Sequence, residues 1–149
     1  MQNNSSNEPE TILQRFRREK KDWRDKIANL NAKMRNIDEL ASLEVSVFSE
    51  RQIVLEYIHK LMEISSAENR TYKKMLRDRI IFYTDSYDIK LDKSQKVMFS
   101  EVDLSNALAK KDLLFNHLDY MRGTLDTIDK MIYGIKWRIQ IEQFKNIRT

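Results

Sequence analysis

The chain has 149 residues, with 27 Lys or Arg against 23 Asp or Glu, and it contains only 2 Gly, 1 Pro and no Cys. This length is enough for one domain with a core, and so few turn-forming residues predict an almost wholly helical fold. The lack of Cys excludes disulfides, thiol catalysis and zinc–thiolate sites. Apolar runs are too short to span a membrane, and the N-terminus has no secretory signal, so we expect a cytoplasmic protein.

The N-terminal part of the chain is polar and then strongly basic. Residues 1–8 are predicted to form a disordered tail, and 9–149 a single helical domain. A helix is expected over 9–36, because Asn7 and Pro9 are typical of a helix start and apolar residues follow at helical spacing. Six cations in ten residues indicate either a nucleic-acid or acidic-partner face, or a solvated surface. They are Arg15, Arg17, Arg18, Lys20, Lys21 and Arg24.

Two central helices are expected over 38–84. The first, to about Glu63, is acidic and is a poor candidate for contact with phosphate. The pair Ser65 and Glu68 has the spacing of a capping box, which predicts the start of the second helix.

The second central helix carries the candidate nucleic-acid interface. Four cations at i, i+3, i+4 and i+7 share a face, and aromatic residues follow them. Cations can hold a phosphate backbone, and rings can stack on unpaired bases. The candidate nucleic-acid-binding residues are Arg70, Lys73, Lys74, Arg77, Arg79, Phe82 and Tyr83. The alternative is that the apolar residues form core and the cations are merely solvated.

A loop is expected over 85–100, because this segment has no clear apolar period. Its acidic residues lack the ligand pattern and central Gly of a calcium-binding EF-hand. Residues 100–103 are predicted to cap a long last helix over 101–147.

The last helix contains a heptad seam of alternating 4- and 3-residue spacing. The seam positions are Leu114, Leu118, Met121, Leu125, Ile128, Ile132, Ile135 and Ile139. Such a seam packs against a partner helix, and other large apolar residues, such as Tyr133 and Trp137, widen it. Because the chain offers too few other long apolar stripes to cover it, we expect a homo-oligomer assembled through these residues. The alternative is one helix of a monomeric bundle.

Catalytic and metal-binding patterns are missing from the sequence. The two histidines, His59 and His117, have no partner at metal-ligand spacing, and there is no Gly-rich phosphate-binding loop. We therefore expect a binding or assembly protein, not an enzyme, without cofactor or metal.

Residues 72–144 resemble the UvsY-type recombination mediator proteins of T-even-like bacteriophages. The similarity lies in a basic stretch ending in an aromatic pair, an acidic helix start, and a C-terminal signature with Gly, Leu and Ile. The matching runs are Tyr72 to Lys74, Arg77 to Thr84, Ser100 to Leu104, Leu118 to Tyr120, Gly123 to Ile128, Ile135-Lys136, and Phe144. The N-terminal extension to about Arg35 has no counterpart in the family.

This resemblance implies a non-enzymatic protein that forms rings of several subunits through its C-terminal region and binds single-stranded DNA. It also implies contacts with a phage recombinase and a single-strand-binding protein in the host cytoplasm. By matching position, Arg77 and Arg79 would be the phosphate contacts. The alternatives are a helical coiled-coil adaptor that binds no nucleic acid, and a basic helical protein that binds a duplex.

Overall fold

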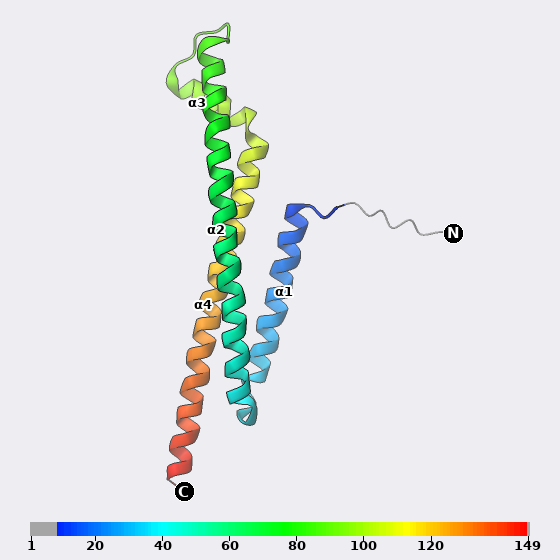
Figure 1. Ribbon diagram of the computed structural model, residues 1–149, viewed down its shortest axis with the longest axis vertical. Helices are drawn as coiled ribbons and strands as arrows, with labels where there is room; N and C mark the ends of the chain where they lie inside the picture. The colour runs from blue at the N-terminus through cyan, green and yellow to red at the C-terminus, as the bar shows by residue number, and fades with distance from the viewer. Residues whose placement is uncertain (1–8, 149) are drawn as a thin grey trace, which may run out of the picture. The chain divides into compact units, whose positions relative to one another are not determined.

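The computed structural model describes residues 9–148, which form four α-helices and one short 3-10 helix (Figure 1). No β-strand occurs in this range. The elements are α1 (Ile12–Lys33), η1 (Ile37–Glu39), α2 (Leu40–Asp85), α3 (Lys93–Asp103) and α4 (Ser105–Ile147). The predicted all-α fold with a long C-terminal helix is confirmed. The predicted tail over 1–8, including Asn7, lies outside the described residues.

Helix α1 is shorter than predicted at both ends. Thr11 is its N-cap: the Gln14 backbone N–H donates to the Thr11 hydroxyl at 3.2 Å, and the Thr11 N–H donates to the Gln14 side chain at 2.9 Å. This reciprocal capping box starts the helix at Ile12, three residues after Pro9. The helix ends at Lys33, not at residue 36.

Helix α2 is continuous over 46 residues, so the predicted break near residue 65 is wrong. Ser and Glu fit a helix interior at small cost, and no Gly or Pro interrupts residues 40–85. Glu68, which was expected to cap the second helix, instead forms an ion pair with Lys110 of α4, with 2.9 Å between the Lys110 Nζ and the Glu68 Oε1.

The predicted loop over 85–100 is wrong in its second half, where α3 forms. Asp92 is the N-cap of α3 and makes a capping box with Gln95. The last helix therefore does not begin at residue 101. Residues 101–103 end α3, Leu104 is its C-cap, and α4 begins at Ser105.

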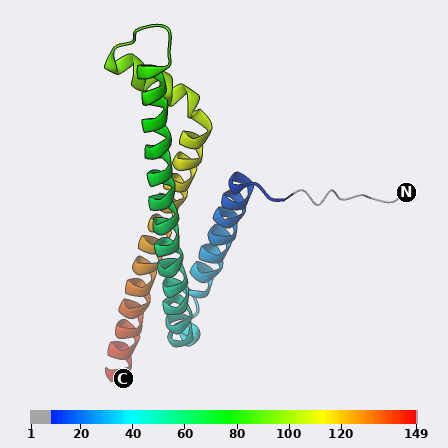
Figure 2. The ribbon, with the colours of Figure 1, turned by 45° about the horizontal axis from the view of Figure 1, so that its top comes forward.

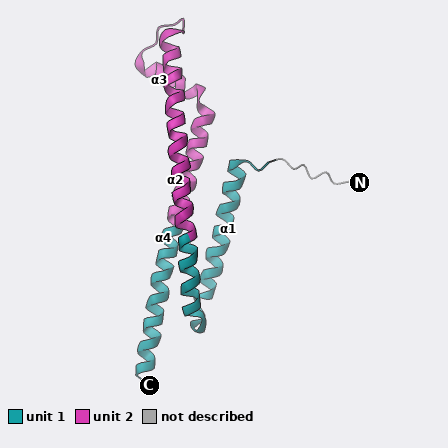
Figure 3. Ribbon diagram, in the orientation of Figure 1, with its two compact units in different colours: residues 1–52, 124–149 teal, residues 53–123 magenta. Residues whose placement is uncertain are grey.

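Two compact units share the long helices (Figure 3). The first contains α1, η1, α2 up to Gln52 and α4 from Thr124; the second contains the rest of α2, all of α3 and α4 up to Gly123. The predicted single domain stays a prediction.

The second unit is built on the antiparallel packing of α2 and α4, which lie side by side in both views (Figures 1 and 2). Val54 of α2 and Met121 of α4 are fully buried. The other buried apolar side chains of this unit are Ile58, Leu61, Tyr72, Tyr83, Leu104, Leu114 and Leu118. His117 is also buried, with Nε2 at 3.3 Å from the Tyr57 hydroxyl.

The first unit adds α1 to the α2 and α4 pair. Its buried apolar residues are Phe16, Leu30, Leu40, Leu43, Val47, Ile128, Met131, Ile132 and Ile135. The C-terminal end of α1 comes close to α4 at Gly134, where an added Cβ would lie 3.5 Å from the Met34 Cε. The Arg138 guanidinium donates to the Met34 carbonyl, and the Lys26 ammonium pairs with Glu50 at 3.1 Å. These contacts hold α1 against its two neighbours.

The heptad seam of α4 is largely buried within its own chain. Six of its eight positions are buried, and only Leu125 and Ile139 are partly exposed. The expectation that the chain has too few apolar stripes to cover the seam is wrong, because the continuous α2 supplies one. Its buried positions are Leu40, Leu43, Val47, Val54, Ile58 and Leu61. Self-association itself stays a prediction.

We expect Ile135→Ala to lower the free energy of unfolding by about 2–5 kcal/mol, because the side chain is fully buried and its removal leaves a cavity. The matched control is Ile147→Ala on the same helix, where the side chain is 82% exposed and the change should be within about 0.5 kcal/mol. Urea unfolding followed by circular dichroism measures both. Equal effects would contradict the intramolecular packing of the seam.

Candidate nucleic-acid interface

One face of α2 in the second unit carries four exposed cations. We call the four the α2 stripe: Arg70, Lys73, Lys74 and Arg77. None of them makes an ion pair within residues 9–148. At about 1.5 Å per residue, the stripe extends for about 10 Å along the helix. Charges that are exposed and not neutralised remain available to an anionic ligand.

Arg79 lies on a different face of α2 from the α2 stripe. Two residues after Arg77, its side chain leaves the helix about 200° further round. Its guanidinium donates from Nε and Nη2 to one carboxylate oxygen of Asp103 in α3, at 3.0 and 2.6 Å. This pair ties α3 to α2, so Arg79 has a structural partner in the chain.

Tyr83 also packs against α3. It is 8% exposed, and its hydroxyl donates to the Asp103 carboxylate at 2.5 Å. Its ring makes edge contacts with Phe82, Tyr87 and Phe99, with centroids 5.1–5.8 Å apart. A base cannot stack on a ring covered in this way.

The charges around Asp103 reinforce one another. The hydrogen bond from Tyr83, and then that from Arg79, lower the pKa of the Asp103 carboxyl below its usual value. In return, the hydrogen bond to Asp103 raises the pKa of both the Arg79 guanidinium and the Tyr83 phenol. The carboxylate, guanidinium and neutral phenol are therefore the stable forms at neutral pH.

Two rings near the end of α2 keep part of their surface exposed. Phe82 is 37% exposed and Tyr87 is 38% exposed, with their centroids 6.3 Å apart. The Arg79 guanidinium lies over the Phe82 ring, 4.5 Å from its centroid. Of the rings in this cluster, these two are the ones that a base could reach.

The seven predicted nucleic-acid-binding residues thus fall into three groups in the structure. It brings the four cations of the α2 stripe together, leaves Phe82 at the edge, and turns Arg79 and Tyr83 toward α3. The role of Asp103 as the shared partner is not predicted from the sequence, because the pattern places this residue at the start of the last helix and not at the end of α3. The i, i+3 spacing of Asp92 and Gln95 is a capping-box pattern that could have predicted α3.

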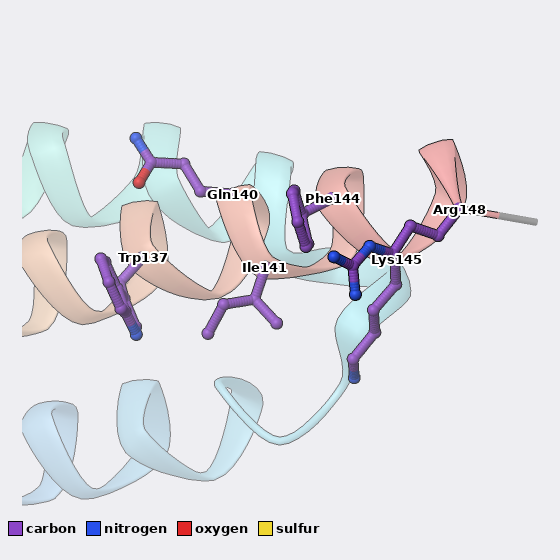
Figure 4. Close-up of a pocket in the computed structure, with 6 residues that line it drawn as sticks. All are labelled: Trp137, Gln140, Ile141, Phe144, Lys145 and Arg148. Carbon is purple, nitrogen blue, oxygen red and sulfur yellow. The ribbon is translucent and has the colours of Figure 1, made fainter.

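A second exposed surface lies at the C-terminal end of α4, in the first unit. Tyr133, Trp137 and Phe144 are 75%, 59% and 58% exposed. A shallow groove of about 500 Å³ runs over the last turns of the helix (Figure 4). It is lined by Trp137, Gln140, Ile141, Phe144, Lys145 and Arg148. We call Tyr133, Trp137, Ile141 and Phe144 the α4 apolar stripe.

Within residues 9–148, no group of three or more His, Asp or Glu side chains could hold a metal ion. In the same range, no helix is both long and apolar enough to cross a bilayer.

No protein family, curated protein or solved structure matches this chain. The resemblance to the UvsY-type mediators therefore stays a prediction from the sequence.

We expect Asp103→Asn to destabilise the protein at pH 7, because it removes the charged acceptor of Arg79 and Tyr83. The folded-state pKa of Asp103 is lowered, so its stabilisation is present above the unfolded pKa and lost as pH falls through the folded value. The difference in free energy of unfolding between wild type and variant should therefore shrink below about pH 4.

Urea unfolding between pH 3 and 7 measures this difference. The control is Asp78→Asn on α2, since Asp78 is exposed and makes no ion pair within residues 9–148. A loss of stability that is the same for both variants, or that does not depend on pH, would contradict the role of Asp103.

Proposed function

We propose that this protein is a non-enzymatic, single-stranded-DNA-binding recombination mediator. In this role it helps to load a phage recombinase onto DNA covered by single-strand-binding protein, in the host cytoplasm if it is phage-encoded. The observation that carries the proposal is the α2 stripe, whose four cations are exposed and make no ion pair in the described chain. The sequence resemblance over residues 72–144 gives the proposal its specific biological role.

The α2 stripe fits the backbone of a nucleic acid better than a specific base sequence. Lys and Arg that neutralise phosphates release condensed counterions, and this term is independent of sequence. A mediator has to bind wherever the recombinase must load, so a contact without sequence preference suits this function. Four cations on one helix make a weak site, which gains strength when repeated around an oligomer.

A preference for single strands would come from Phe82 and Tyr87. Both rings lie beyond the last residue of the α2 stripe and keep more than a third of their surface exposed. Base stacking on such rings contributes about 1–3 kcal/mol per base and does not depend on sequence. Duplex bases are already stacked and cannot use these rings.

Self-assembly, which the mediator role requires, would use the α4 apolar stripe. The heptad seam is the less suitable surface for this contact, because six of its eight positions are buried within the same chain. The α4 apolar stripe lies on consecutive turns of one helix face, and large aromatic residues are typical anchors of protein interfaces. A contiguous apolar surface of this kind commonly marks a contact with another protein.

We expect the replacement of all four cations of the α2 stripe by Gln to weaken binding to oligo-dT and to lower the salt slope by about 3. Each phosphate contact with a single strand contributes about 0.7 to the slope of log K against log salt concentration. Fluorescence anisotropy of a labelled oligo-dT, titrated at several salt concentrations, measures both quantities. Gln keeps helix propensity, so the circular dichroism spectrum should not change.

The control removes four cations that already have carboxylate partners. Arg51, Lys110, Lys130 and Lys145 pair with Asp129, Glu68, Asp126 and Glu142. Their replacement by Gln changes the net charge by the same amount as the α2 variant does, but it should leave the salt slope near that of the wild type. An unchanged slope in the α2 variant, or no binding by the wild type, would reject the proposal.

We expect Trp137→Glu with Phe144→Glu to reduce the mass of the oligomer in sedimentation experiments, because charges would replace the exposed anchors of the α4 apolar stripe. The control is Phe115→Glu, at an equally exposed ring on the same helix but outside this stripe. A monomeric wild type would remove the oligomer from the proposal. An oligomer unaffected by the double substitution would place the interface elsewhere.

A helical adaptor that binds only proteins is the second candidate. It is favoured by the burial of Tyr83 and by the pairing of Arg79, which remove two residues from the nucleic-acid interface. The α4 apolar stripe would then be the main binding surface. In the anisotropy experiment, an adaptor would show weak binding that is equal for oligo-dT and duplex.

A further inference from the structure

Helix α1 carries a second cationic stripe with the same pattern as the α2 stripe. Residues 17–24 and 70–77 both read Arg-x-x-Lys-Lys-x-x-Arg. In a helix this spacing places all four cations on one face within two turns. The α1 stripe, namely Arg17, Lys20, Lys21 and Arg24, lies in the first unit, and the α2 stripe lies in the second.

The carboxylates of α1 do not neutralise most of this stripe. Arg18, beside the stripe, makes two hydrogen bonds of 2.9 Å to Glu10 and an ion pair of 3.8 Å to Asp22. Arg15 pairs with Glu19 at 2.9 Å. Glu10, Glu19 and Asp22 are therefore paired with cations that lie outside the stripe.

Three cations of the α1 stripe stay exposed. Arg17, Lys21 and Arg24 are spaced at i, i+4 and i+7, and none of the three makes an ion pair within residues 9–148. The buried residues of α1, Phe16 and Leu30, are on another side of the helix. The stripe is thus displayed on a helix that is anchored by its apolar face.

We propose that the α1 stripe is a second binding site for the phosphate backbone of single-stranded DNA. The inference rests on the proposed function for its ligand, because the three exposed cations of the α1 stripe repeat the i, i+4 and i+7 spacing found in the α2 stripe and so suit the same phosphates. One chain then holds a strand through two similar, sequence-independent contacts, one in each compact unit. Two weak sites linked in one chain raise affinity by increasing the effective concentration at the second site.

The test is the salt dependence of oligo-dT binding by Arg17→Gln/Lys21→Gln/Arg24→Gln in the full chain. The expected result is a salt slope lower than that of the wild type by about 2, at about 0.7 per phosphate contact on a single strand. Combined with the α2 variant, the loss should be close to the sum, about 5, because the two stripes contact different phosphates.

The matched control is Arg15→Gln/Arg18→Gln/Lys26→Gln, which removes three cations of the same helix that have carboxylate partners. Its slope should stay near that of the wild type. If the salt slope falls by the same amount in the two triple variants, the loss comes from net charge and not from a specific site, and the inference fails.

The outcomes separate this inference from the proposed function. A wild type that does not bind oligo-dT rejects both. If the α2 variant loses salt slope but the α1 triple variant keeps the slope of the wild type, only the second site is rejected. Should that variant lose helicity, Lys21→Glu alone replaces it, since this single exposed substitution should still weaken binding and lower the slope.

Discussion

Burial of the apolar seam of α4 against α2 is the interaction on which the rest of the structure depends. Two helices of more than forty residues pack antiparallel, and the fully buried Val54, Met121 and Ile135 mark this contact. Apolar side chains removed from water supply most of the stability of such a pair. Because one face of each helix is buried in this contact, the other faces can carry charged residues and bind ligands.

The short helix α3 shows how packing changes the role of particular residues. Asp103 accepts hydrogen bonds from both Arg79 and Tyr83, so a cation and a ring that look like DNA-binding residues instead hold α3 on α2. Carboxylates with partners of this kind stay charged and are costly to lose. The cations of the α2 stripe, two to nine residues before Arg79, make no ion pair within residues 9–148 and are the ones suited to an external anion.

The proposed function combines features that are each weak alone. The α2 stripe, the α1 stripe and the partly exposed rings supply charge and stacking surfaces without any base-specific contact. Repetition of such contacts within a chain, and around an assembly formed through the α4 apolar stripe, would turn weak sites into strong binding. The same binding would respond steeply to salt, which allows a mediator to release its strand to a competing partner.

The sequence by itself determined the helical class, the long last helix and the cationic face of Arg70 and Lys74. Each of these depends on composition or on local periodicity. Only the tertiary structure decided that α2 runs unbroken through Ser65, that α3 is held against α2 through Asp103, and that the seam is covered by its own chain. The partner of a side chain is a non-local property: Arg77 and Arg79 look alike in sequence, and only the position of Asp103 distinguishes them.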